Sequence, residues 1–312
     1  MRVLLLGRRS GVTHWLEDVA QGLGRLGHDV RVLFVRNPWL HPRLQTALEG
    51  PVAARLERLA RAFAPELMLV IGGFHAPAAI LERLRALASH APLVGWVGDA
   101  FDDDADAGRA AALYDLVAYT DTGLQARHQA LGVSCPAVFA PHAVDPGARI
   151  LSRRRDPRMV FIAHPTPGRR AIVRGLEAPI VLHGAGWSRE DGPHAIQRGR
   201  TPHRALAGLY AGHLAALNIR NELHVLAGLN QRSFDPYLSA TPVVSDDQPD
   251  LAHCFTPGEE VFVWRDATEL NALYARLRRS PAEAARVGEA GQRRLLADHT
   301  VERRLETIMA AL

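Results

Sequence analysis

The chain has 312 residues, of which 47% are hydrophobic and 22% charged, as expected for a soluble globular protein of about two domains. Its 37 basic residues are all arginines, and set against 33 acidic residues they leave a net charge of +4, too small to indicate a nucleic-acid partner. No stretch reaches the roughly 18 apolar residues of a membrane-spanning helix, so we expect at most peripheral membrane contact.

The first half alternates short apolar runs with helical spacing. Strands are expected at residues 3–6, 30–35, 67–71, 93–97, 116–119 and 137–139, and helices at 13–26, 55–63 and 78–88. This order predicts a doubly wound parallel sheet whose ligand groups follow the strand ends, at residues 7–14, 72–75 and 98–101.

The alternation restarts after a proline-bounded connector at residues 141–146. Strands are expected at residues 159–163, 180–182 and 215–219, and helices at 169–176, 203–211, 281–297 and 301–311. The sequence therefore predicts an α/β protein with two Rossmann-like halves.

The most informative stretch runs from residue 226 to 264. A loop containing Gly228 is predicted to open a short helix, which a β-branched strand and a cluster of short polar residues follow. A helix start offers backbone N–H groups and a positive dipole to a phosphate, and Arg232 adds a charge-assisted hydrogen bond. Asp235, about one turn further on, is expected to accept hydrogen bonds from sugar or ribose hydroxyls.

Several motifs in this half resemble group 1 glycosyltransferases, most closely their CgeB-like (spore maturation) branch. The resemblance rests on Asn230, Arg232, Phe234 and Asp235, then on Asp250, Leu251, Phe255, Pro257, Gly258 and Glu260, with Asp235 standing where the family has Glu. Further matching elements are residues 160–162 with Arg169 and Arg170, the run from Gly184 to Trp187, residues 209–210 and 217–219, and residues 96–99 of the first half.

The resemblance implies the GT-B architecture, in which two Rossmann-like domains face each other across a cleft. The expected domains are residues 1–150 for the acceptor and 151–297 for the nucleotide-sugar, with a helix at 298–312 packing back on the first domain. The implied activity is transfer of a hexose-type sugar from a UDP- or TDP-sugar to a hydroxyl acceptor, with no metal and no other cofactor.

Within this hypothesis, basic groups hold the diphosphate of the donor. Arg169, Arg170 and Arg232 are candidates, together with backbone N–H groups at Gln231 and Arg232, although Arg169 and Arg170 equally fit a solvated helix start. Trp187 is expected either to stack on the nucleotide base or to serve as a core residue. The remaining candidate donor-binding residues are Gly11, Gly184, Asn230 and Asp235.

Deprotonation of an acceptor hydroxyl requires a general base. Asp99, at a strand end, and His14, in the first loop, are the candidates in the first half. A structural role is the alternative for each, as a capping aspartate and a helix-entry histidine. If the enzyme retains configuration, neither needs to be a base.

Other classes of function find less support. The glycine run at residues 22–27 ends a predicted helix rather than opening one, so we expect no NAD, and the histidines lack the spacing of a metal site. Two cysteines without a metal-type spacing, and an apolar start too short for a signal peptide, predict a cytoplasmic protein. A sugar-nucleotide epimerase and a degenerate transferase that only binds partners stay open as alternatives.

Overall fold

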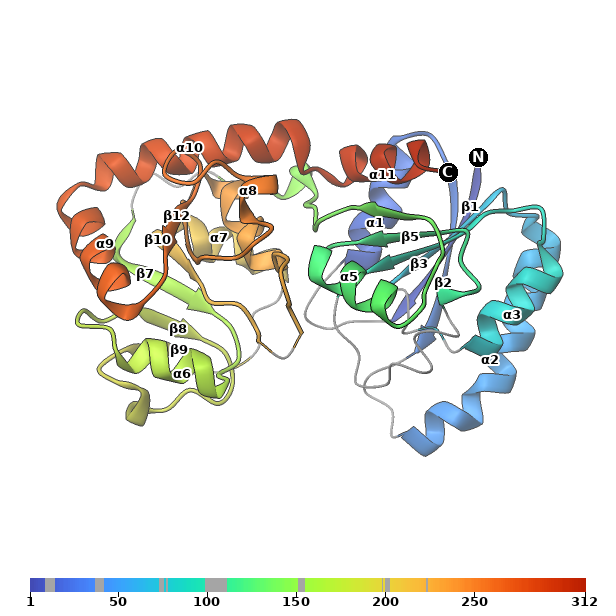
Figure 1. Cartoon of the computed structure of the whole chain (residues 1–312), viewed down its shortest axis with the longest axis horizontal. Coiled ribbons are helices and arrows are strands. Elements are labelled where there is room, and N and C mark those ends of the chain that lie inside the picture. Colours follow the sequence, from blue (N-terminus) through green and yellow to red (C-terminus); the bar gives the residue numbers. More distant parts are fainter. Residues whose placement is uncertain are drawn as a thin grey trace. The chain divides into compact units, whose positions relative to one another are not determined.

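The computed structural model describes residues 1–8, 15–36, 42–72, 76, 78–98, 111–150, 155–197, 199, 203–222 and 224–312. The chain divides into two compact units, one made of Met1–Pro141 with Val301–Leu312 and the other of His142–Thr300. The first unit therefore ends before the boundary expected at residue 150. Within the described ranges each unit has one parallel six-stranded sheet, which confirms the predicted α/β class (Figure 1).

The sheet of the first unit has the strand order β2-β1-β3-β4-β5-β6. The strands are β1 (Arg2–Arg8), β2 (Asp29–Arg36), β3 (Leu67–Ile71), β4 (Leu93–Val97), β5 (Leu116–Tyr119) and β6 (Ala137–Phe139). The helices described in this unit are α1 (Trp15–Arg25), α2 (Pro42–Phe63), α3 (Ala78–Leu87), α5 (Thr122–Ala130) and α11 (Val301–Ala310).

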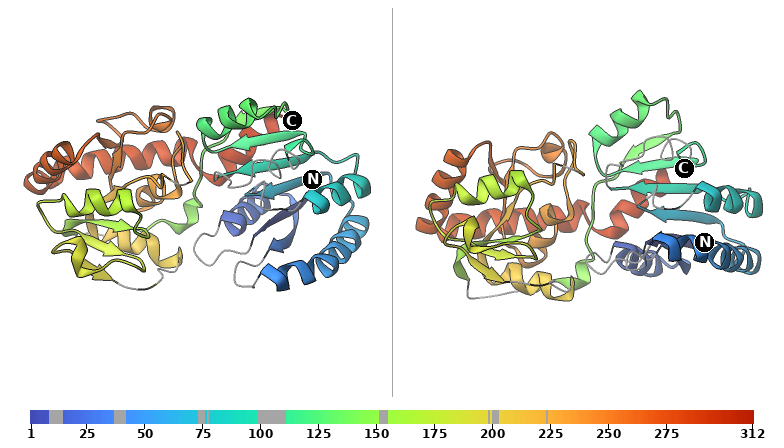
Figure 2. Two further views of the ribbon diagram at one scale, coloured as in Figure 1. Left: turned by 60° about the horizontal axis from the view of Figure 1, so that its bottom comes forward. Right: turned by 90° about the horizontal axis from the view of Figure 1, so that it is seen from below.

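The two faces of this sheet carry different helices because side chains alternate along each strand. Leu4 and Leu6 pack in one cluster with Leu56 of α2 and Leu81 of α3. The opposite face receives α1, and α11 packs against α1 within the same unit (Figures 1 and 2). Helix α2 begins at Pro42, well before the residue 55 expected from its spacing, and Pro51 lies inside it.

The sheet of the second unit has the strand order β12-β11-β10-β7-β8-β9. Its strands are β7 (Asp156–Ile162), β8 (Val181–His183), β9 (Ala195–Gln197), β10 (His213–Asn218), β11 (Val243–Asp246) and β12 (Phe262–Trp264). The α-helices are α6 (Pro167–Arg174), α7 (His203–Ala211), α8 (Leu251–Cys254), α9 (Ala267–Arg279) and α10 (Pro281–Asp298). The short 3₁₀ turns are η2 (Pro146–Ala148), η3 (Arg189–Asp191), η4 (Gln231–Ser233) and η5 (Asp235–Ser239).

The order of this second sheet creates a topological switch point between β7 and β10. From β7 the chain proceeds outward to β8 and β9, then returns beside β7 and proceeds outward the other way through β10, β11 and β12. Successive crossovers from the two central strands therefore lie on opposite faces: α6 packs in the core with Phe161, and η5 packs against α7 on the other side. In open α/β sheets such a point leaves a crevice at the carboxyl ends of the strands, where ligands bind.

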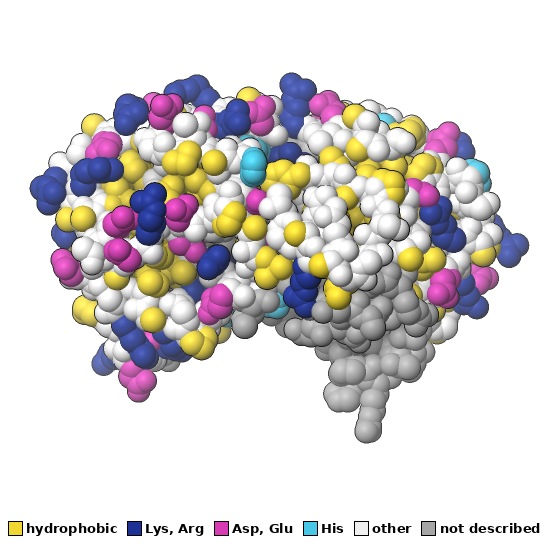
Figure 3. All heavy atoms as spheres, in the orientation of Figure 1, with side chains coloured by type: hydrophobic (Ala, Val, Ile, Leu, Met, Phe, Trp, Pro, Cys, Tyr) yellow, Lys and Arg dark blue, Asp and Glu magenta, His cyan; other side chains and the backbone are white. Residues whose placement is uncertain are grey.

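The coloured part of the face drawn in Figure 3 shows no concentration of one charge. Arginine side chains are interspersed there with acidic ones. In the part of the chain that the structure describes, no helix is both long enough and apolar enough to span a membrane.

Candidate functional site

The segment expected to open a phosphate-binding helix forms two 3₁₀ turns instead. Asn230 precedes η4, and its side-chain Oδ1 accepts a hydrogen bond from the backbone N–H of Arg232 at 2.9 Å. A three-residue turn aligns too few peptide dipoles to resemble a helix terminus. The expected helix is therefore a short turn, and the N–H of Arg232 has Asn230 as its acceptor in this structure; binding of a phosphate at the turn stays a prediction.

Two arginines approach the switch point from its two sides. Arg232 lies half-buried in η4, after β10, and Arg169 lies in the first turn of α6, after β7. The guanidinium of Arg169 is buried and donates to the carbonyl of Ile219 at 3.1 and 3.2 Å and to that of His164 at 3.0 Å. These carbonyls follow β10 and β7 respectively, so the side chain joins the ends of the two central strands.

Among the described residues, no carboxylate oxygen lies within 4 Å of a guanidinium nitrogen of Arg169. Burial, and next the positive charge of Arg232, lower the pKa of Arg169 to about 9, while Glu222 and Asp246 act in the opposite direction. Arg169 is therefore still protonated at neutral pH. Two like charges, one of them buried, repel each other, and an anion bound beside them would relieve that repulsion.

Arg170, the next residue in α6, has a different environment. Its guanidinium pairs with the carboxylate of Asp191, donates to the carbonyl of Gly186 at 2.6 Å and lies 5.7 Å from the ring centroid of Trp187. Asp191 is fully buried and also pairs with Arg174 at 3.1 Å. This arginine therefore holds the loop after β8 together.

Gly184 and Trp187 belong to that same loop. Trp187 is 3% exposed, its indole N–H donates to the carbonyl of Ala163 at 2.7 Å, and its ring packs against Phe161. Gly184 has φ +140°, and a Cβ there would clash with the Ala163 carbonyl. Of the two interpretations of Trp187, the structure supports the core residue, because no face of the buried ring is open to a base.

Asp235 is also buried, with 5% of its surface exposed. Its carboxyl accepts a hydrogen bond from Gln231 Nε2 at 2.8 Å, and the same amide nitrogen donates to the Ala143 carbonyl at 3.0 Å. Burial raises the pKa of Asp235 to about 7, although Gln231 and Arg232 act to lower it. The expected role of Asp235 as an acceptor for sugar or ribose hydroxyls stays a prediction, made for a carboxyl that is buried and already accepts from Gln231.

Two further acidic residues lie at this edge of the sheet and were not among the candidates. Asp246, at the end of β11, accepts from the backbone N–H of Arg220 at 3.2 Å, and burial raises its pKa. Glu222 accepts from Thr166 Oγ1 at 2.8 Å and from the N–H of Gly168 at 3.3 Å, and so caps α6. A strand-terminal acid was visible in the sequence at Asp246, whereas nothing local marked Glu222.

Three candidates, Gly11, His14 and Asp99, lie outside the described residues. Among the residues that are described, no group of three His, Cys, Asp or Glu side chains is arranged to hold a metal ion.

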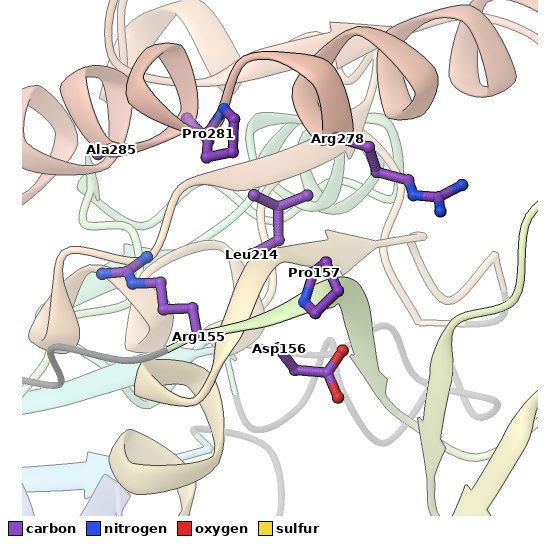
Figure 4. A pocket seen from close by; sticks show the side chains of 8 residues that line it. Arg155, Asp156, Pro157, Leu214, Arg278, Pro281 and Ala285 are labelled. Carbon is purple, nitrogen blue, oxygen red and sulfur yellow. The ribbon is translucent and has the colours of Figure 1, made fainter.

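A separate pocket of roughly 130 Å³ lies at the opposite edge of the second sheet (Figure 4). Its lining includes Arg155 and Pro157 at the amino end of β7, Leu214 near the start of β10, and Pro281 at the start of α10. Because ligands of such sheets bind at the carboxyl ends of strands, this pocket is a weaker candidate than the switch point.

Residues 166–310 of the chain match a protein-family model described as "Glycosyl transferase-like". Comparison of the sequence with curated proteins finds no match. The structure is similar over 99% of the chain to 98% of a sucrose-phosphate synthase from Thermosynechococcus elongatus, with a TM-score of 0.73 and 13% identity. It is similar over 100% of both chains to Anabaena HepE in complex with UDP and glucose, with a TM-score of 0.72 and 13% identity.

The chain has the GT-B fold. A third neighbour with this fold is a glycosyltransferase involved in avilamycin A biosynthesis, matched over 99% of this chain and 96% of that one, with a TM-score of 0.66 and 15% identity. The family match covers α6, η4 and η5, and so contains both Arg169 and Arg232.

Proposed function

We propose that this GT-B protein is a glycosyltransferase that moves a hexose-type sugar from a UDP- or TDP-sugar to a hydroxyl acceptor without a metal ion. The observation that carries the proposal is the approach of Arg169 and Arg232 at the switch point of the second unit. The match to a glycosyl transferase-like family model and the UDP-glucose complex of Anabaena HepE support this assignment. The motif from Asn230 to Asp235 favours the CgeB-like branch.

The chemistry requires charge stabilisation at the leaving group. When the bond between the sugar and the diphosphate breaks, negative charge develops on the diphosphate oxygens. Arg169 is fixed by three hydrogen bonds to carbonyl oxygens, so its charge is oriented before the donor binds. Arg232 supplies the second charge from the opposite side, and guanidinium groups bind phosphate oxygens well because their donors form a planar fork.

The acceptor is expected to bind to the first unit, which would also supply any general base. Asp99 and His14 keep that proposed role, and a base at either position would raise the rate by roughly 10²–10⁴. Arg170, Gly184 and Trp187 would act on the donor only through the loop after β8, since each is engaged in internal contacts.

Isothermal titration calorimetry with UDP and TDP tests the proposal directly. The Arg232→Ala variant is expected to weaken binding of the preferred diphosphate about 10- to 100-fold, the value of a charge-assisted hydrogen bond of about 1.5–3 kcal/mol. Arg286→Ala is the matched control, because Arg286 is an exposed arginine on α10 of the same unit. Undiminished affinity in the Arg232→Ala variant, or no binding of either diphosphate to the wild type, would contradict the proposal.

Activity separates transfer from the rival reaction. With a sugar donor and a panel of hydroxyl acceptors, the wild type should release the nucleoside diphosphate and form a glycoside. If incubation of the nucleotide-sugar without an acceptor yields a nucleotide-sugar with one inverted sugar carbon, the protein is an epimerase instead.

A further inference from the structure

A buried asparagine lies directly beneath the proposed diphosphate-binding turn. Asn218 is the last residue of β10, has no exposed surface and pairs with Ser245 of β11 in the sheet register. Its neighbour Leu217 packs into the core on the other face of the sheet, because successive side chains of a strand point to opposite faces. A fully buried amide is tolerated only when its polar atoms have partners.

The hydrogen bonds of Asn218 connect the sheet to η4. Its Nδ2 donates to Ser233 Oγ of η4 and to Ser245 Oγ of β11, each at 3.1 Å. Its Oδ1 accepts from Nδ2 of Asn230 at 3.1 Å. The side chain thus joins the adjacent strands β10 and β11 to both ends of the turn that carries Arg232.

A backbone group determines the orientation of this whole chain of amides. The N–H of Arg232 can only donate, so the atom of Asn230 facing it must be Oδ1. Asn230 therefore donates from its Nδ2 to Asn218, so the accepting atom of Asn218 must be Oδ1. The Nδ2 of Asn218 then faces the two serines and donates to both. The amide then uses both of its hydrogens and one acceptor site, and no other orientation satisfies the set.

We propose that Asn218 is a positioning residue for the diphosphate of the donor, which it serves by fixing η4 and thereby Arg232. The proposal rests on the function proposed above. Asn218 does not touch the ligand; it holds Asn230 and Ser233, and Asn230 in turn holds the backbone N–H of Arg232. Misplacing a binding group by about 1 Å is enough to lose much of its effect.

The Asn218→Leu variant removes all three hydrogen bonds while keeping the number of side-chain heavy atoms and the branch at Cγ. We expect affinity for UDP to fall about tenfold or more, since loss of one charge-assisted contact has that value. Affinity for uridine, measured by ligand-observed NMR, should stay within about twofold, because the arginine pair contacts only the phosphates. Hydrogen exchange of the Arg232 amide should also accelerate, since its acceptor is no longer held. TDP and thymidine replace this ligand pair if the wild type prefers TDP.

Asn271→Leu is the matched control for loss of a structural asparagine. Asn271 lies on α9 of the same unit, where its amide donates to the Gly175 carbonyl at 2.8 Å and accepts from the N–H of Glu177 at 3.0 Å. This variant should lose thermal stability but keep the wild-type ratio of UDP to uridine affinity. A purely structural role for Asn218 would give the same result.

A second variant decides the question if Asn218→Leu does not fold. Ser233→Ala removes only the hydrogen bond that the turn accepts from Asn218 through Ser233 Oγ. It should lower the affinity for UDP about two- to fivefold and leave the affinity for uridine unchanged. The positioning role is refuted, and the proposed function is left standing, if the folded Asn218→Leu variant keeps the wild-type ratio of UDP to uridine affinity. The same result in Ser233→Ala has this meaning where that variant is used. If wild-type protein binds UDP and TDP no more tightly than their nucleosides, the proposed function fails and the positioning role fails with it.

Discussion

Two adjacent arginines in α6 illustrate how the environment of a side chain decides its role. Arg169 is buried without a carboxylate within 4 Å in the described structure, whereas Arg170 is neutralised by a fully buried aspartate. A guanidinium that is already paired gains little from a ligand phosphate, because binding would require breaking the existing ion pair. Arg169 is therefore the better candidate for the diphosphate.

The Arg170→Ala variant should separate these roles. Removing this arginine leaves Asp191 buried with Arg174 as its remaining ion-pair partner, so the unfolding free energy of the second unit should fall by about 1–3 kcal/mol. Affinity for the nucleoside diphosphate should stay at the wild-type value. Calorimetric unfolding and titration check the two effects, and a loss of affinity equal to that of Arg232→Ala would show that Arg170 reaches the ligand.

Asp235 should make the stability of the second unit depend on pH. Burial raises its pKa from 3.8 to about 7, so between these values the unfolded chain has released a proton that the folded chain retains. Stability contributed by the neutral carboxyl is complete below pH 4 and is lost as the pH rises toward 7, by up to a few kcal/mol. Asp235→Asn removes this titration, so the variant should gain stability relative to wild type as the pH rises from 4 to 7.

Denaturation of both proteins at several pH values measures that difference. Glu259→Gln is the control, because Glu259 is an exposed carboxylate of the same unit. A constant difference between Asp235→Asn and wild type over this range would refute the assignment of a raised pKa.

Helix α10 supports the turns of the candidate site through two glycines. A Cβ at Gly288 would overlap the carbonyl of Ala240, and a Cβ at Gly291 would overlap the ring of Tyr237. Gln292 adds hydrogen bonds to the carbonyls of Tyr237, at 2.9 Å, and Leu238, at 3.3 Å. The close approach of helix and turn therefore requires the absence of side chains on one stripe of α10.

Two glycine-to-alanine substitutions in helices should have opposite effects. Gly291→Ala should destabilise the second unit by about 1–3 kcal/mol, because the well-packed ring of Tyr237 must move. Gly208→Ala, in α7, should stabilise it by about 0.5–1 kcal/mol, since its Cβ meets nothing closer than 3.9 Å and alanine favours the helix. Melting temperatures of the two variants test this contrast, and a gain in stability for Gly291→Ala would show that the packing is looser than described.

The chain returns to its first unit at its end. Helix α11 follows the whole second unit in sequence, but it packs on α1, with Val301, Leu305 and Ile308 buried. Gly22 of α1 allows this approach, because a Cβ there would lie 2.5 Å from Val301 Cγ1. Arg25 and Glu302 form an ion pair beside that contact. The first unit is therefore complete only when the last residues of the chain are present.

Gly22→Val should lower the thermal transition of the first unit and leave that of the second unchanged. Differential scanning calorimetry with and without the nucleoside diphosphate assigns the transitions, because the ligand raises only that of the unit to which it binds. Gly24→Ala is the control, since nothing lies within 4 Å of a Cβ at that position of α1. A Gly22→Val protein with wild-type transitions would contradict the packing of α11 on α1.

The order of strands and helices was predictable because hydrophobic periodicity is local. Apolar runs followed by glycine or polar residues placed the principal strands of both sheets, and these sufficed to predict two α/β halves. The edge strands β9 and β12 were not predicted. The segment of η4 and η5 was expected to form a helix and forms 3₁₀ turns instead. The sequence could not show this, because the short polar side chains that hold the turns bond to partners distant in sequence.

The site was predictable as a set of residue types but not as an arrangement. Adjacent residues on a helix point about 100° apart, so the sequence could not say which of Arg169 and Arg170 meets Arg232. Trp187 and Asp235 were identified as candidates, but their burial depends on Phe161, Ala163 and Gln231, which only the folded chain brings to them. The contacts of Asn218 arise because β10, β11 and η4 converge at the carboxyl edge of one sheet, and convergence of distant segments leaves no local pattern in a sequence.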